Sequence, residues 1–256
     1  MMSDALQLAE EAWKIHSAFT HTPCLVSPSL PILYFGDLSA YQDSPVRIVS
    51  VGLNPSKVEF PDDALCRFPT VRRLAHAAAS SLDQDSLHAY LGSLNDYFRT
   101  FPYSKWFDGA YADLLRGMGA SFYGDRANTA LHTDLCSPLA TNPTWRDLDR
   151  THRANLMSRG VPLWHELVEV LEPDLALIFV ASAHLSLLQF QFLAPWETIY
   201  TVERENPYVV AGARVRLRSG KNTLLVFGRA AQLPFGTLSY AARHSLGEFL
   251  IGQTCE

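Results

Sequence analysis

The sequence predicts an α/β fold, a three-layer αβα sandwich around a four-stranded, mainly parallel sheet. Two observations indicate this fold. Short apolar runs of strand length alternate with segments of helical periodicity, as expected for parallel strands joined by crossover helices. The chain has 256 residues, 48% of them hydrophobic, which is enough for a sizeable core, and it contains no repeat or linker. We therefore expect one domain over residues 1–256, with an N-terminal helix and Pro-rich loop (about 1–45) packed on it.

In the first half of the chain, helices are expected where apolar residues recur every three or four positions, and strands where β-branched residues run together. In order, the expected elements are a helix at Asp4–Phe19, a Pro-rich loop at Pro23–Pro31, a short strand at Ile32–Phe35, a core strand at Val46–Val51, and helices at Thr70–Ser80, Ser86–Arg99 and Trp106–Met118. Ser3 is a suitable N-cap for the first helix, Gly52 stops the core strand, and Gly119 ends the last helix.

The second half supplies the remaining core strands. In order, the expected elements are a core strand at Asn128–Asp134, an irregular segment at Ser137–Trp145, a helix at Pro162–Leu171, a core strand at Asp174–Val180, a helix at Ala183–Phe192, an extended pair at Trp196–Glu203 and Val209–Arg218, a core strand at Thr223–Phe227 and a helix at Leu238–Leu250. Pro162 suits the first turn of a helix. Ligands of such sheets bind beyond the carboxyl ends of the strands, so a site is expected in the segments that follow the core strands.

Charge and cysteine content exclude some classes of protein. The formal net charge of -5 and the pI near 6.0 argue against coating nucleic acid through charge alone, although a local basic cleft stays open. The four cysteines, Cys24, Cys66, Cys136 and Cys255, lie far apart, so free thiols are expected, with no metal and no cofactor.

No apolar run approaches ~18 residues, and the acidic N-terminus is unlike a signal peptide. We expect a cytoplasmic protein without membrane contact.

The loop Gly52–Ser56 follows the first core strand. Glycine lets the backbone approach a ligand closely, and Pro55 fixes the turn after Asn54. Asn54 would then project a short amide from a rigid loop, able to hold a water molecule or a ligand oxygen. The alternative is that Asn-Pro simply makes a turn.

The second core strand ends in His132-Thr133-Asp134. Strand alternation predicts that His132 and Asp134 share a face, which suits acid–base work or the reading of a base edge. The alternative is an Asp that caps the loop and a His that is satisfied in the core.

Two further segments carry candidate contacts. The loop Gly228–Gly236 combines Arg229, Gln232 and Phe235, a mixture that suits phosphate contact with an apolar wedge; the alternative is a plain loop leading into the last helix. Phe68 lies fourteen residues beyond Asn54 and could fold back over the loop to stack on a ring, or it could be a core residue.

Taken together, these segments resemble the uracil-DNA glycosylase superfamily, nearest its mismatch-specific and single-strand-selective branches. Gly52-Leu53-Asn54-Pro55 is similar to the family's G-[IM]-N-P-G motif, with Ser56 in place of the last glycine. Ala130–Asp134 with Leu135–Leu139 is similar to the N-x-C-P-L segment, with one extra residue. The order of the core strands also agrees, so the resemblance covers roughly Val46 to Leu250.

The resemblance implies a role for each candidate residue. Asn54 would position the attacking water, Phe68 would stack on a flipped base, and Asp134 would read its edge. Gly52 and Pro55 would line the pocket, and the Arg229–Phe235 loop would grip the backbone and plug the duplex. Many members carry His-Pro-Ser where this chain has Gly228-Arg229-Ala230, so Arg229 or His132 would have to replace that histidine.

Asp134 stands where the family usually has Asn. An ionised carboxylate only accepts hydrogen bonds, so it suits a base with adjacent N–H donors, such as guanine or a related purine, better than uracil. The leading hypothesis is a DNA glycosylase-like hydrolase that acts on a modified or mismatched base. Two alternatives stay open: a nucleotide or nucleic-acid binding protein of the same fold without activity, and an enzyme that acts on free nucleosides or nucleotides. The expected partner is DNA, single-stranded DNA included, or a nucleotide, and the expected state is a monomer.

Overall fold

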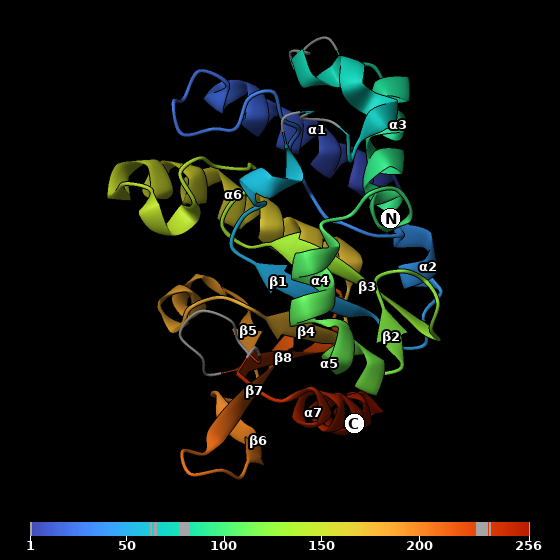
Figure 1. Cartoon of the computed structure of the whole chain (residues 1–256), viewed down its shortest axis with the longest axis vertical. Coiled ribbons are helices and arrows are strands. Elements are labelled where there is room, and N and C mark those ends of the chain that lie inside the picture. The colour runs from blue at the N-terminus through green and yellow to red at the C-terminus, as the bar shows by residue number, and fades with distance from the viewer. Residues whose placement is uncertain are drawn as a thin grey trace. The chain divides into compact units, whose positions relative to one another are not determined.

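A computed structural model describes residues 2–61, 63, 66–76, 82–228, 235 and 237–255. The chain is α/β, and it divides into two compact units, each built from three stretches of sequence. The first unit contains Met1–Asp37, Gly52–Tyr103 and Thr133–Leu171, and the second contains Leu38–Val51, Ser104–His132 and Glu172–Glu256. Figure 1 labels the elements of both units.

The second unit holds nearly all of a mixed, mostly parallel sheet, whose strand order is β2-β3-β1-β4-β8-β7-β5, with β6 also paired to β7 (Figure 1). Within the described residues the strands are β1 Ile48–Gly52, β2 Ala120–Ser121, β3 Asn128–Asp134, β4 Leu175–Ile178, β5 Gln191–Phe192, β6 Glu197–Val202, β7 Tyr208–Arg216 and β8 Asn222–Gly228. β4 pairs in parallel with β1 and β8, whereas β7 is antiparallel to each of its partners.

All four predicted core strands are found, as β1, β3, β4 and β8, and β3 has the predicted bounds. The predicted edge pair is also confirmed, because β6 and β7 form an antiparallel ribbon. The sheet nevertheless has eight strands in the described part of the chain instead of four. The strands that the sequence did not indicate, β2 and β5, are two residues long each, which is too short for any periodicity.

The helices of the second unit are α2 Leu38–Gln42, α4 Ser104–Ala110, α5 Ala112–Gly117 and α7 Tyr240–Gly252. The single helix expected at Trp106–Met118 is therefore two helices, separated at Tyr111. α5 and α7 pack backbone against backbone, because a Cβ added at Gly247 would lie 2.2 Å from the carbonyl oxygen of Leu114. Only glycine allows this approach.

The helices of the first unit are α1 Met2–Phe19, α3 Gln84–Asn95 and α6 Arg150–Leu171, and α1 packs against both of the others. Trp13 of α1 is fully buried, with its ring edge against Tyr90 of α3. The Tyr90 hydroxyl donates to the carbonyl oxygen of Pro31 over 2.8 Å, which ties the Pro-rich segment to this helix layer. Across the described residues, no helix combines the length and the apolar character needed to span a bilayer.

The α6 helix begins twelve residues before the predicted start at Pro162. The carboxylate of Asp149 accepts the backbone N–H of His152 over 2.8 Å, as an N-cap does, and the helix then runs through Pro162. An interior proline costs a hydrogen bond and about 3 kcal/mol. Burial of Leu156, Leu163 and Trp164 on the same helix offsets that cost, since each large apolar side chain contributes about 1.5–3 kcal/mol.

Three other predictions are wrong in part. Ile32–Phe35 is buried but forms no strand. The segment predicted as a helix at Ala183–Phe192 contains a 3-10 helix, Ser182–Leu187, followed by β5. The helix predicted at Thr70–Ser80 is a 3-10 helix at Pro69–His76, and positions 77–80 lie outside the described residues.

Candidate functional site

The Gly52–Ser56 loop and the segment after β3 lie side by side in the first unit. The backbone N–H of Leu135 donates to the carbonyl oxygen of Gly52 over 2.9 Å, and that of Cys136 donates to Leu53 over 2.8 Å. The loop after β1 and the segment after β3, both predicted from the sequence as parts of a site, are thus joined by backbone hydrogen bonds. Gly52 and Pro55 are themselves buried.

Asn54 is fixed by its amide nitrogen. Nδ2 lies 3.2 Å from the carbonyl oxygen of Leu139, 3.2 Å from Oγ1 of Thr141 and 3.1 Å from the carbonyl oxygen of Pro55. Because carbonyl oxygens can only accept, the amide cannot be flipped, and Oδ1 must point away from this trio. No described residue donates a hydrogen bond to Oδ1, and Asn54 is partly exposed. Asn54 therefore offers an oriented acceptor.

Ser56 begins a short 3-10 helix, Lys57–Glu59. Its Oγ accepts the backbone N–H of Val58 over 3.2 Å, which caps the first turn. This turn directs Glu59 inward, where it is only 3% exposed. Ser56 thus has a local structural role, and the turn that it caps places a carboxyl group five residues after Asn54.

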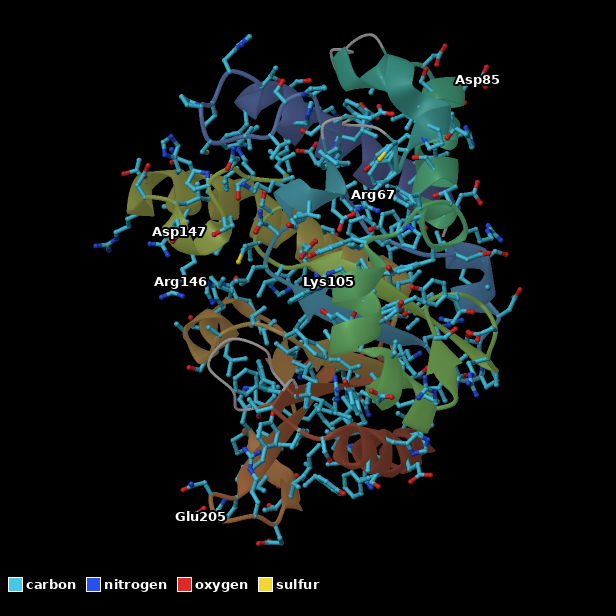
Figure 2. All side chains as sticks on the ribbon, in the orientation of Figure 1. Arg67, Asp85, Lys105, Arg146, Asp147 and Glu205 are labelled. Atoms are coloured by element: carbon cyan, nitrogen blue, oxygen red, sulfur yellow. The ribbon has the colours of Figure 1, made fainter. Side chains whose placement is uncertain are left out.

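Glu59 belongs to a buried polar cluster with Tyr97 and Arg67. The Tyr97 hydroxyl donates to Oε2 of Glu59, and Nε of Arg67 lies 3.7 Å from the same oxygen. The Arg67 side chain, 8% exposed, also donates to the carbonyl oxygen of Phe101 and lies 4.9 Å from the centroid of that ring. Figure 2 labels Arg67 together with Asp85 and Glu205, which are exposed, as most charged residues are.

The environment of Glu59 favours its neutral form. Burial raises the pKa of the Glu59 carboxyl to about 7, with a smaller contribution from the negative charge of Asp134. The hydrogen bond from Tyr97 and the charge of Arg67 lower this pKa, but by less. A carboxyl whose pKa lies near neutrality can exchange a proton at physiological pH, which is the property required of a general acid or base.

Phe68 is in the core of the first unit. It has 0% exposed surface, and its ring stacks on Phe60 and Tyr97 with centroids 5.7 Å apart in each case. Of the two alternatives for Phe68, the one that places it in the core is therefore confirmed. To stack on a base, this ring would first have to lose one of its present partners.

Asp134 ends β3 next to the Asn54 loop and is 7% exposed. It lies on a cavity of about 10 Å³ whose other walls include Pro138, Gly160 and Trp164. Such a volume admits about one water molecule, not a base. Its charge also adds to the burial that raises the pKa of the Cys136 thiol to about 12.

His132 lies in the second unit and is also buried, with 4% exposure. Nδ1 is 2.8 Å from the hydroxyl oxygen of Ser50, and the ring is edge-on to Phe107 and Tyr111, with centroids 5.2 and 5.7 Å away. His132 is therefore a buried core residue with a hydrogen-bond partner, which is the alternative stated from the sequence. Its proposed catalytic role has no support from these contacts.

Phe235 was predicted as an exposed wedge, and this is wrong. The residue is fully buried, its backbone N–H donates to the Tyr208 hydroxyl over 2.7 Å, and its ring lies 5.1 Å from that of Phe179. Gly228 makes this possible, because a Cβ there would come within 2.7 Å of the Phe235 ring. The small residue thus admits a side chain of its own loop instead of a ligand. Arg229 and Gln232 lie outside the described residues.

Metal chemistry has no candidate in the described part of the chain, where no three His, Cys, Asp or Glu side chains come together. Cys24, Cys66 and Cys136 are free thiols, as predicted. The sequence pattern does not indicate Glu59 as a site residue. It stands between Val58 and Phe60 with no spacing that indicates chemistry, and the residue that donates to it, Tyr97, lies 38 residues further along the chain.

In the first unit, then, Asn54, Asp134 and the unpredicted Glu59 make up the candidate site.

Comparison of the chain with models of known protein families gives no match, and comparison with curated proteins gives none either.

Proposed function

We propose that this chain is a glycosylase-like hydrolase that cleaves the N-glycosidic bond of a modified or mismatched base in DNA, single-stranded DNA included. The observation that carries the proposal is the orientation of Asn54. Three acceptors hold its Nδ2, so Oδ1 is left as a fixed acceptor at the end of the loop after β1. Such an acceptor can hold a water molecule for attack on the sugar carbon, with little reorganisation at the moment of reaction.

The proposed reaction also needs a proton acceptor, because an amide does not take up a proton. Water attacks C1′ of the sugar, the C1′–N bond breaks with its electron pair on the base, and the water gives up a proton. Glu59 and Asp134 are the two buried carboxyl groups among the described residues, and they interact electrostatically. Glu59 in its ionised form is the better candidate, since its pKa of about 7 matches the operating range of a general base.

A second candidate function is binding of a nucleotide or nucleic acid without cleavage. Two observations favour it: Phe68 has no exposed surface, and the space at Asp134 is about 10 Å³. A glycosylase must hold a whole base in a pocket. The binder needs no such pocket at this point.

The test is base release from oligonucleotides that carry uracil, hypoxanthine, xanthine or a mismatch, detected as strand scission after alkali. We expect the unaltered chain to release at least one of these bases, and Asn54→Ala to lower the rate about a hundredfold or more. Asn155→Ala, at an exposed position of α6, is the matched control and should retain the full rate.

Two results would count against the proposal. Full activity of Asn54→Ala would remove the assignment of the water site. Oligonucleotide binding without scission for every base in the panel would favour the second candidate function.

A further inference from the structure

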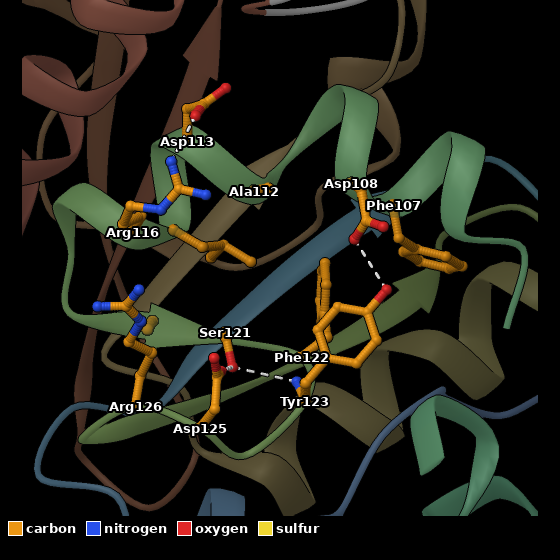
Figure 3. Close-up of a pocket in the computed structure, with 12 residues that line it drawn as sticks. Phe107, Asp108, Ala112, Asp113, Arg116, Ser121, Phe122, Tyr123, Asp125 and Arg126 are labelled. Carbon is orange, nitrogen blue, oxygen red and sulfur yellow. Dashed lines mark hydrogen bonds and ion pairs between the residues drawn. The ribbon is translucent and has the colours of Figure 1, made fainter. Parts of the chain in front are cut away.

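The second unit contains a cavity of about 310 Å³ that is separate from the Asn54 loop in sequence and in unit. Its walls come from α4, α5, β2 and the loop that follows β2 (Figure 3). Apolar side chains, among them Phe107, Leu115 and Phe122, form part of the lining. A volume of this size lies at the lower end of the range for small-molecule sites.

Tyr123 offers a ring at this cavity. It is 40% exposed. Its hydroxyl donates to Oδ1 of Asp108 over 2.8 Å, and its backbone N–H donates to Oγ of Ser121 over 3.1 Å. Both ends of the residue are therefore held, which fixes the ring before any ligand arrives. Preorganisation of this kind lowers the entropic cost of binding.

Two arginines lie on the opposite side of the cavity, together with Asp113 and Asp125. Figure 3 shows Arg116 and Arg126 on one side, with Asp108 and Tyr123 on the other. Arg116 pairs with Asp113 over 2.9 Å, but Asp113 is shared with Arg243 at 3.6 Å, so one carboxylate serves two guanidinium groups. Arg126 has no hydrogen bond or ion pair with any described residue.

The acceptor on the side of Tyr123 is Asp108 (Figure 3). Asp108 uses one carboxylate oxygen for the Tyr123 hydroxyl, and no described residue donates to the other. Asp125, on the side of Arg126, accepts from the hydroxyl of Ser121 (Figure 3). The lining thus combines a held ring, the Asp108 carboxylate beside it and two guanidinium groups across from it. A simple anion would leave the ring and the Asp108 carboxylate unused, and a simple cation would leave the ring and Arg126 unused.

We propose that this cavity binds a nucleoside 5′-monophosphate, with the base stacked on Tyr123, base N–H groups donating to Asp108, and the phosphate bound by Arg126 and Arg116. A planar ring with N–H donors at one end and an anion at the other uses all three features. Guanidinium groups match phosphate geometry well. The inference does not depend on base release at Asn54, because none of its residues belongs to that loop.

Calorimetric titration of the 256-residue chain with AMP, GMP and UMP tests the proposal. We expect saturable binding of at least one nucleotide, and at least tenfold weaker binding of the matching nucleoside, which lacks the phosphate. Arg126→Ala should weaken nucleotide binding about tenfold and leave nucleoside binding unchanged. Tyr123→Ala should weaken both about tenfold, because stacking is lost in each case.

Two matched variants control for unspecific effects. Tyr240→Ala removes a tyrosine of the same unit that is 73% exposed and does not line the cavity, and Arg159→Ala removes an exposed arginine of α6. Both should bind nucleotides like the unaltered chain. No saturable binding of any of the three nucleotides overturns the proposal. Equal binding of nucleoside and nucleotide would also overturn it, and so would equal losses of affinity in the control variants. Free tryptophan, an aromatic ligand without a phosphate, should bind more weakly than the nucleotides; tighter binding would overturn the proposal as well.

Discussion

At the scale of single residues, the amide nitrogen of Asn54 faces more acceptors than it has hydrogens. Its two N–H groups are offered three oxygens, from Pro55, Leu139 and Thr141, all between 3.1 and 3.2 Å away. The orientation of the amide is therefore overdetermined, and the loss of one acceptor should leave Oδ1 where it is. The acceptor role and the structural role of this residue can thus be separated by substitution.

Thr141→Val provides that separation. Valine has nearly the shape of threonine but lacks the hydroxyl, and Thr141 is only 2% exposed. We expect the free energy of unfolding to fall by about 1 kcal/mol, the usual net value of one hydrogen bond, while the rate of base release stays within a few-fold. Denaturant titration and the scission assay measure the two quantities. A collapse of activity equal to that of Asn54→Ala would mean that Nδ2, not Oδ1, is what matters.

Residue types at strand ends were enough to predict Gly52, Asn54 and Asp134 as neighbours, because loops that follow neighbouring parallel strands meet at one edge. The burial of Phe68 and Phe235 could not be predicted in the same way. An aromatic residue in a loop is compatible with the surface and with the core, and the choice depends on partners such as Tyr97 and Tyr208, which are distant in sequence. Glu59 was missed for the same reason.

At the scale of elements, α6 rests directly on the segment after β3. A Cβ added at Gly160 would lie 2.2 Å from the carbonyl oxygen of Cys136 and 2.6 Å from Cα of Ser137. Both of those atoms belong to backbone, which cannot move aside cheaply. The same segment donates to Leu53 through the Cys136 N–H, so the position of α6 bears on the Asn54 loop.

Gly160→Ala is therefore expected to destabilise the protein by about 3 kcal/mol, the upper part of the range for overpacked cores. Gly92→Ala, within α3, is the matched control, since nothing lies within 4 Å of its added Cβ. That variant should be about 0.5–1 kcal/mol more stable than the unaltered chain, because alanine favours a helix over glycine. Denaturant titration measures the free energy of unfolding of both variants. Equal effects would show that α6 can shift away from the segment after β3 without loss of stability.

The extent of α6 shows where element prediction fails. The stretch Arg150–Arg159 is mainly polar, and a proline follows at position 162, so local propensity indicates no helix before it. The helix nevertheless forms, because Leu156, Leu163 and Trp164 are buried on it. Strands β4 and β8 were predictable, because a continuous run of apolar residues indicates a strand that is buried on both faces.

At the scale of the whole molecule, the order of strands and helices indicated α/β, but the division into units was not visible. The chain passes between the two units after residues 37, 51, 103, 132 and 171, and no glycine- or proline-rich linker marks these points. Two of them fall inside strands, β1 and β3. A linker search cannot detect a boundary of this kind, because regular secondary structure continues across it.

Glu59 makes the stability of the molecule depend on pH in an unusual direction. Its pKa is raised from 4.5 to about 7 in the folded state, mainly by burial, so the folded chain holds this proton more tightly than the unfolded chain does. The resulting contribution is complete below pH 4.5 and is lost as the pH rises through about 7. The shift corresponds to about 3 kcal/mol.

Glu59→Gln removes this titration while it keeps an acceptor for the Tyr97 hydroxyl. Relative to this variant, the unaltered chain should lose about 3 kcal/mol of unfolding free energy between pH 4.5 and pH 8, with most of the change below pH 7. Denaturant titration at several pH values measures the difference, in which the other titrating groups cancel. Glu197→Gln, at an exposed position of β6, should show a difference that does not change with pH. If the Glu59→Gln difference were also constant, Glu59 would already be ionised at pH 5, and it would then be the Arg67 ion pair, rather than burial, that governs this carboxyl.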